Sequence, residues 1–293
     1  MKLLFIYNPR AGKAKIRSNL LDIIDIFTKA GFLVTAHPTQ GTGDATNIVG
    51  RVKAGSYDLI VCSGGDGTLD EVVSGLMKFK LNIPLGYIPA GTTNDFARNL
   101  RISSNMITAA ERICHRHAFA CDIGYFNEAN FVYIAAFGLF TDVSYETKQD
   151  IKNLLGQTAY ILEGIKRLAD LKMCRMRVVS EGIDFEDDFV FGMVTNSISV
   201  GGFKHLTGKR VKLDDGLFEV TLIKKPKNPL ELNNLIAALL TRSYNAECMF
   251  NFKTEKISFT CDEEVPWTLD GEFGGRHFEV TITNMKQAIE IIC

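Results

Sequence analysis

The stretch of the chain best suited to chemistry is Gly64–Leu76, where a glycine-rich turn leads from a strand into a helix. The apolar run Leu59–Cys62 predicts a buried strand, and apolar residues at helical spacing follow the turn. A strand that opens through glycines into a helix presents backbone N–H groups to an anion. Asp66 adds a carboxylate to this turn. A carboxylate beside phosphates indicates a bridging cation, so the turn predicts metal–nucleotide chemistry.

Two other predicted strands end in similar turns, at Asn8–Lys13 and at Pro89–Asp95. In a parallel sheet all three turns lie at the carboxyl edge, where open α/β sheets bind ligands. Three such turns, two of them with an aspartate, favour a ligand site over ordinary connectors. They match neither the Walker A loop nor the dinucleotide-binding fingerprint, and the protein-kinase motifs are absent. The sequence therefore predicts phosphate binding by another kind of loop.

The composition narrows the class of protein. A chain of 293 residues is long enough for two domains, and a net charge of −1 gives no reason to expect nucleic acid as a partner. Seven scattered cysteines predict reduced thiols in a cytoplasmic protein. The apolar start of the chain is too short for a signal peptide, and no apolar segment approaches the length of a membrane span. Any contact with a membrane is expected to be peripheral.

The expected elements change in character along the chain. Strands are predicted at Leu3–Tyr7, Phe32–Ala36, Leu59–Cys62 and Leu85–Ile88, and helices at Ser18–Lys29, Ala45–Ala54, Leu69–Phe79 and from Thr93. Short apolar strands between helices imply a parallel sheet covered on both faces. Later strands are predicted at Phe131–Ala136, Arg175–Ser180, Asp188–Thr195, Phe218–Ile223, Lys256–Cys261, Phe278–Thr283 and Ala288–Ile292, with helices only near Ile151–Leu171 and Leu230–Thr241. The sequence thus predicts an α/β domain at residues 1–124 and a β-rich sandwich domain at 125–293.

Several segments, in this order and spacing, resemble one known family. They are NPRAGK at Asn8–Lys13, GGDGTLDEVV at Gly64–Val73, IPAGTTNDFAR at Ile88–Arg98, CDIG at Cys121–Gly124, SYET at Ser144–Thr147, KLDDGL at Lys212–Leu217 and LDGE at Leu269–Glu272. Together they resemble the diacylglycerol kinases, above all the bacterial soluble group, which is similar to sphingosine and ceramide kinases. The resemblance covers essentially the whole chain. It implies an NAD-kinase-like N-terminal domain and Mg²⁺-dependent transfer of the γ-phosphoryl group of ATP to a lipid hydroxyl.

The resemblance also implies roles for individual residues. Nucleotide contacts would fall on Asn8, Pro9, Arg10, Ala11, Gly12, Thr39, Gly65, Asp66, Gly67, Thr68, Leu69, Asp70, Glu71 and Thr92. The carboxylates around metal and water would be Asp66, Asp95, Asp122 and Asp270. Lys13 would offset phosphate charge, and Glu272 would be the general base, because an alkyl hydroxyl is too weak an acid to ionise beforehand.

Ordinary structural roles compete with several of these assignments. Turn or helix-cap duty would account for Asn8, Thr92 and Asp95, and an exposed loop position would account for Thr39. Asp122 and Glu272 could simply be turn residues. The resemblance further implies a second, structural Mg²⁺ site, in which Asp215 and the carbonyl groups of Lys212 and Leu217 supply oxygen ligands. An acidic turn is the alternative there.

The lipid side of the site is less well marked. Phe137, Leu139, Phe140 and the helix Tyr160–Leu171 are candidates to line a lipid cleft, although such residues are more often core. A basic loop at Lys224–Lys227 could touch anionic headgroups, and a solvated loop is the alternative. The expected partner is a lipid substrate at the inner membrane surface, reached from the cytoplasm, and a homodimer is possible.

Three functions follow as hypotheses. The first is a kinase that converts diacylglycerol to phosphatidic acid. The second is a kinase for another lipid alcohol, such as phosphatidylglycerol or a sphingoid base. The third is a sensor that binds nucleotide or lipid without turnover. The presence of a candidate base argues against this third function.

Overall fold

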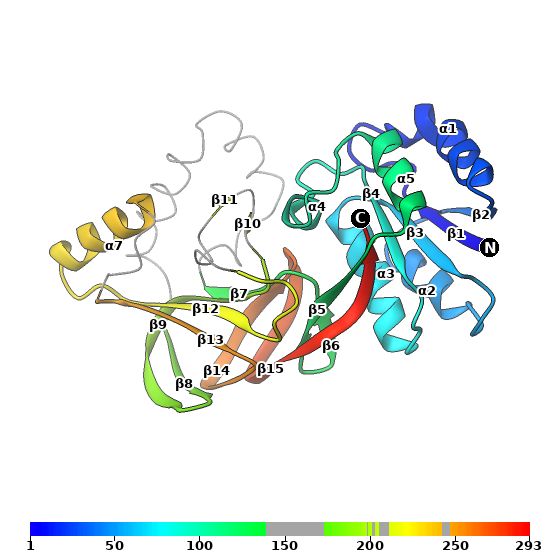
Figure 1. The fold of residues 1–293 in the computed structure, drawn as a ribbon. Coiled ribbons are helices and arrows are strands. Elements are labelled where there is room, and N and C mark those ends of the chain that lie inside the picture. Colours follow the sequence, from blue (N-terminus) through cyan, green and yellow to red (C-terminus); the bar gives the residue numbers. More distant parts are fainter. Residues whose placement is uncertain (139–172, 198, 201–202, 205–210, 242–246) are drawn as a thin grey trace.

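The computed structural model in Figure 1 describes residues 1–138, 173–197, 199–200, 203–204, 211–241 and 247–293. The expected helix at Ile151–Leu171, the SYET segment, and the lipid-cleft candidates Leu139, Phe140 and Tyr160–Leu171 lie outside these residues. Within them, no helix is long and apolar enough to cross a membrane.

The N-terminal domain is a parallel sheet between two layers of helices. Its strands are β1 (Lys2–Tyr7), β2 (Leu33–Pro38), β3 (Leu59–Gly64) and β4 (Leu85–Pro89), and its helices are α1 (Ile16–Lys29), α2 (Asp44–Gly50), α3 (Asp66–Lys78), α4 (Asp95–Asn99) and α5 (Met106–His115). The strands lie in the order β4-β3-β1-β2. Alternate strand residues face opposite sides, so Leu4 and Ile6 pack with α2 and α3 while Leu3 and Phe5 pack with α1 and α5. The expected α/β class is confirmed.

The C-terminal domain is built mainly of antiparallel strands. They are β5 (Ala118–Phe126), β6 (Ala129–Phe131), β7 (Ile134–Gly138), β8 (Cys174–Ser180), β9 (Ile183–Thr195), β10 (Ser199–Val200), β11 (Phe203–Lys204), β12 (Phe218–Lys224), β13 (Met249–Thr254), β14 (Lys256–Leu269) and β15 (Glu272–Ile292), with helix α7 (Pro229–Thr241). Trp267 lies at the centre of an aromatic core, with ring centroids 4.9 Å from Phe137 and 5.2 Å from Phe259. Phe137, a lipid-cleft candidate, is therefore a core residue.

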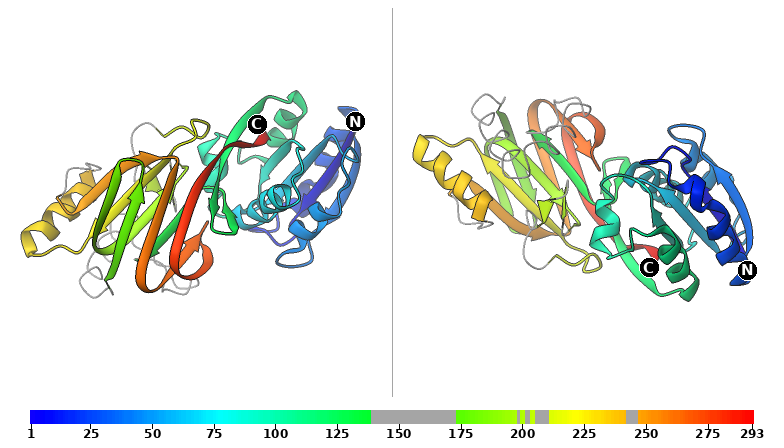
Figure 2. Two further views of the ribbon diagram at one scale, coloured as in Figure 1. Left: turned by 90° about the horizontal axis from the view of Figure 1, so that it is seen from below. Right: turned by 90° about the horizontal axis from the view of Figure 1, so that it is seen from above.

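One strand, β15, joins the two domains. It starts as the antiparallel partner of β14 and ends as the parallel partner of β4, where Ile291 pairs with Leu85. Figures 1 and 2 show this strand, coloured red, running from the β-rich domain into the N-terminal domain, where the chain ends. The two strands expected within it are one, because the irregularity between Met285 and Ile289 does not end the pairing with β5. The expected boundary at residue 124 falls inside β5.

Candidate active site

Three loops meet at the carboxyl edge of the N-terminal sheet. The backbone N–H of Asn8 donates to the carbonyl oxygen of Ser63 at 2.8 Å, and that of Ala90 donates to the carbonyl oxygen of Gly64 at 2.8 Å. Gly12, with φ of +54°, lies so close to the β4–α4 loop that a Cβ atom would stand 2.4 Å from the Ala90 oxygen. The glycines therefore permit the loops to approach closely and leave their backbone N–H groups at this edge.

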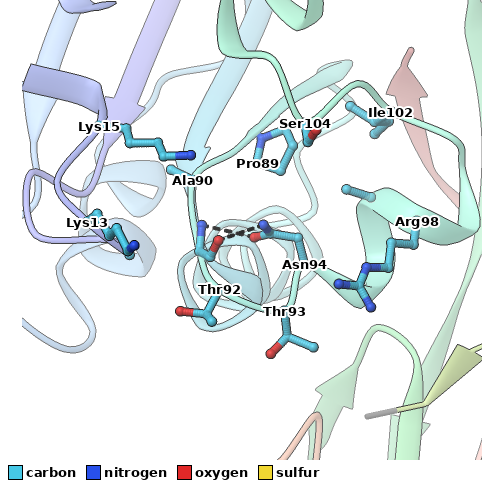
Figure 3. Close-up of a pocket in the computed structure, with 13 residues that line it drawn as sticks. Lys13, Lys15, Pro89, Ala90, Thr92, Thr93, Asn94, Arg98, Ile102 and Ser104 are labelled. Atoms are coloured by element: carbon cyan, nitrogen blue, oxygen red, sulfur yellow. Dashed lines mark hydrogen bonds between the residues drawn. The ribbon is translucent and has the colours of Figure 1, made fainter. Parts of the chain in front are cut away.

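Tyr87 and Asn94 brace the β4–α4 loop against the loop before α3. Asn94 adopts a left-handed conformation, with φ of 50°. Its side-chain oxygen accepts from the N–H of Gly91 at 3.0 Å, and its amide donates to the Gly91 carbonyl at 2.8 Å, the contacts dashed in Figure 3. From within the sheet, the Tyr87 hydroxyl lies 3.1 Å from the Gly64 carbonyl oxygen and 3.4 Å from Asn94 Oδ1. A buried tyrosine with such partners holds the two loops in register, a role that the sequence alone did not indicate.

Asp66 and Asp95 lie where these two loops open into helices. Asp66 begins α3, and its carboxylate accepts long hydrogen bonds from the backbone N–H groups of Asp95, at 3.3 Å, and Phe96, at 3.4 Å. Burial and the nearby Asp95 carboxylate raise the pKa of Asp66. Asp95 is only 2% exposed. The structure thus brings these two predicted carboxylates together.

Asp270 approaches the same place from the C-terminal domain. It occupies the β14–β15 turn with a φ of 49°, and its carboxylate accepts from the N–H groups of Val132, Tyr133 and Ile134 at 2.5, 2.9 and 3.0 Å. These donors favour the charged form, but burial outweighs them and raises the pKa of Asp270 to about 6. The charge of Asp66 acts in the same direction.

Asp70 connects the acids of the two domains. It lies one turn after Asp66 on α3, and its carboxyl group is close enough to that of Asp270 for the two to act on each other's ionisation. Burial, followed by the charges of Asp270, Glu71 and Glu272, raises the pKa of Asp70 well above its ordinary value. Within the described residues its Oδ1 atom is buried without a hydrogen-bond partner. We refer to Asp66, Asp70, Asp270 and Glu272 as the acidic cluster. Carboxyl groups this close together require a shared proton or a cation.

Basic side chains gather on another side of the β4–α4 loop. A pocket of about 380 Å³ lies between this loop and the β1–α1 loop, and no acidic residue is among those that line it. Lys13 and Lys15 extend from one wall and Arg98 from the other, with Thr92 and Thr93 between them (Figure 3). The loop edge therefore has a negative side suited to a cation and a positive side suited to an anion.

Both domains of the chain match known proteins. Residues 2–126 match the diacylglycerol kinase catalytic domain, and residues 136–293 match the YegS C-terminal NAD kinase beta sandwich-like domain. The diacylglycerol kinase of Bacillus subtilis is 34% identical over 92% of this chain and 89% of its own length, and that of Staphylococcus saprophyticus is 33% identical over 98% and 93%. The chain belongs to the diacylglycerol kinase family. A crystal structure of a diacylglycerol kinase from Bacillus anthracis superposes with a TM-score of 0.82 at 28% identity, over 99% of this chain and 96% of that one.

Other predicted nucleotide contacts of this diacylglycerol kinase family member have structural partners of their own. The amide of Asn8 donates to the Thr68 hydroxyl at 3.3 Å. The carboxylate of Glu71 accepts from the N–H groups of Gly43 and Ala45 at 2.7 and 3.1 Å, which fixes the start of α2. The Thr39 N–H donates to the carbonyl oxygen of Tyr7, at the end of β1, at 2.9 Å. Leu69 is buried in the core. Contact of these residues with a nucleotide stays a prediction.

Asp122 lies apart from these loops, in a network that holds the Lys212–Leu217 loop. It is fully buried, and its carboxylate accepts from the N–H groups of Gly216 and Gln287, both at 2.7 Å. These contacts give it a positioning role between β5, the loop and β15, and its catalytic role stays a prediction. In the loop, Asp215 Oδ1 accepts from the Leu217 N–H at 3.1 Å. The ligands that the resemblance implies here, the Asp215 carboxylate and the carbonyl groups of Lys212 and Leu217, are all oxygen donors of the kind that a hard divalent cation prefers.

Proposed function

We propose that this protein transfers the γ-phosphoryl group of ATP to the hydroxyl of a lipid, with diacylglycerol as acceptor and phosphatidic acid as product. The observation that carries the proposal is the acidic cluster, in which Asp66 and Asp70 of the nucleotide-binding edge meet Asp270 and Glu272 of the other domain. A phosphoryl donor and its acceptor must be held in line, and a site formed by two domains can hold one from each side.

The loops at the sheet edge would hold the donor. Backbone N–H groups at the start of α3 and the hydroxyls of Thr68 and Thr92 are suited to phosphate oxygens. Lys13 is placed to offset phosphate charge. Mg²⁺ is usually held by one or two carboxylates together with phosphate oxygens and water, so Asp66 and Asp270 are the candidates to hold it. When bound, the ion would neutralise charge that develops on the transferred phosphoryl group.

Glu272 would accept the proton of the lipid hydroxyl. It is exposed at the first position of β15, next to the turn that carries Asp270. Its negative charge contributes to the raised pKa of Asp70. A carboxylate at this place can reach an acceptor that arrives from solvent or from a membrane surface. Peripheral contact with a membrane would bring that acceptor to Glu272 without a spanning segment.

The proposal is tested by ADP release with mixed micelles that contain dioleoylglycerol, phosphatidylglycerol or sphingosine, with ATP and Mg²⁺ present. We expect release that depends on dioleoylglycerol and the appearance of radiolabelled phosphatidic acid. Phosphorylation of another lipid alone would reassign the acceptor. Lack of lipid-dependent release with every acceptor, by protein that still binds nucleotide, would favour a binding protein.

A further inference from the structure

An ammonium group of the protein lies beside the carboxylate expected to hold the structural cation. Lys253, on β13, places its Nζ atom 2.7 Å from Glu219 Oε1 and 3.6 Å from Asp215 Oδ2. Glu219 and Lys253 are directly paired residues of β12 and β13, so the backbone register fixes their approach. Asp215 reaches the same ammonium from the loop that precedes β12.

Burial explains why a cation is needed at this position. Glu219 is only 7% exposed, and a buried carboxylate is costly unless it is paired. Lys253 supplies its counter-charge, and the same ammonium is near Asp215. The protein itself thus supplies a positive partner for Asp215.

We propose that the Lys253 ammonium and a divalent cation are alternative partners of Asp215, so that Lys253 holds the loop when the cation is scarce and weakens cation binding. The inference takes from the family resemblance only that the Lys212–Leu217 loop is a cation site, and it does not depend on the kinase activity proposed above. Two positive groups on one carboxylate repel each other, and the repulsion is only partly screened near a buried site. Removal of the ammonium must therefore strengthen binding of the divalent cation.

The exchange would be transmitted to the junction between the domains. Gly216 of the same loop donates its N–H to Asp122, which also accepts from Gln287 on β15. Gln287 in turn donates its side-chain amide to the carbonyl oxygen of Asp214 at 3.3 Å. A change in the partner of Asp215 is therefore adjacent to the strand that begins at Glu272.

The test is a thermal-melting titration with MgCl2, without nucleotide, after treatment with EDTA. We expect Lys253→Met to melt below the wild type in EDTA, because Glu219 loses its counter-ion, and to show a Mg²⁺ midpoint at least tenfold lower. The double variant Glu219→Gln/Lys253→Met removes the buried pair as a whole, so it keeps the test available if the single variant folds poorly. Its midpoint should also fall below that of the wild type.

Two further variants control for the site and for overall charge. Asp215→Asn in the Lys253→Met background should remove the gain, which separates this loop from the acidic cluster. Lys256→Met removes an exposed lysine near the start of β14 and should leave the midpoint unchanged. Midpoints of both Lys253 variants within twofold of the wild type would overturn the proposal. Because the readout is melting, its failure is distinguishable from an absence of kinase activity.

Discussion

The contact between Asp70 and Asp270 makes a test of the acidic cluster possible through stability alone. We predict that Asp70→Asn stabilises the metal-free protein at pH 8 while it lowers kinase activity. The substitution removes one of two carboxylates that repel each other, and the new amide can donate a hydrogen bond to Asp270. No backbone donor to the Asp70 side chain is lost among the hydrogen bonds of the described residues.

The pKa of Asp270 shows how costly an ionised carboxylate is in the acidic cluster. A pKa raised from 3.8 to about 6 corresponds to roughly 3 kcal/mol against the ionised carboxylate in the fold. The folded state binds this proton more tightly than the unfolded state, so the stability present at low pH is lost as the pH rises through about 6. Asp70→Asn leaves the burial of Asp270, the main cause of that shift, in place and removes only the repulsion between the carboxylates. With the added hydrogen bond to Asp270, we expect a gain of about 1 kcal/mol at pH 8.

The assay is thermal melting in EDTA between pH 5 and pH 8. Wild-type protein should melt at a higher temperature as the pH falls toward 5.5, and Asp70→Asn should show a flatter profile that lies several degrees above it at pH 8. Asp262→Asn, an exposed position on β14, is the matched control and should change neither curve. If Asp70→Asn melts at or below the wild-type temperature at pH 8, the two carboxyl groups do not share the environment described here.

Three further predictions address the base, the loop brace and the α2 anchor. Glu272→Gln should lower kcat by about 10²–10⁴-fold while nucleotide affinity, measured with a fluorescent ATP analogue, stays within a few-fold; near-normal turnover would remove Glu272 from the role of base. Tyr87→Phe should raise the KM for ATP by about 2–10-fold, because the hydroxyl that joins the loops proposed to hold the phosphates is lost; an unchanged KM would reduce Tyr87 to a core residue. Glu71→Ala should lower the free energy of unfolding by roughly 2 kcal/mol in urea, since two N–H groups at α2 lose a charged acceptor; an unaltered midpoint would contradict that anchor.

The N-terminal domain could be predicted well from the sequence because its signals are local. The continuous apolar runs of β1, β3 and β4 predict strands buried on both faces, and the spacing of apolar residues in α1 and α3 predicts helices. Parallel strands then place the turns after β1, β3 and β4 at one edge. The meeting of these turns therefore follows from topology alone.

The features that were missed depend on partners far away in the chain. Asp122 resembles a turn residue in sequence, yet its carboxylate accepts hydrogen bonds from Gly216 and Gln287, which lie 94 and 165 positions further along the chain. The single strand β15 was read as two because Asn284–Gln287 interrupt its apolar pattern, and Gln287 has a left-handed φ of 51°. Tyr87 resembles any other core aromatic residue, and only the position of its hydroxyl separates it from them.

The continuity of β15 constrains how the two halves of the site can move. Glu272, a member of the acidic cluster, begins this strand, and Ile292 at its other end pairs with Gly86 of β4, the strand that leads into the loop before Asp95. Glu272, the proposed base, is therefore tied to the N-terminal sheet through the backbone hydrogen bonds of β15. A displacement of Glu272 relative to Asp95 must bend β15 or break that pairing. The irregularity between Met285 and Ile289 is where the ladder is already interrupted, so bending there costs the fewest hydrogen bonds.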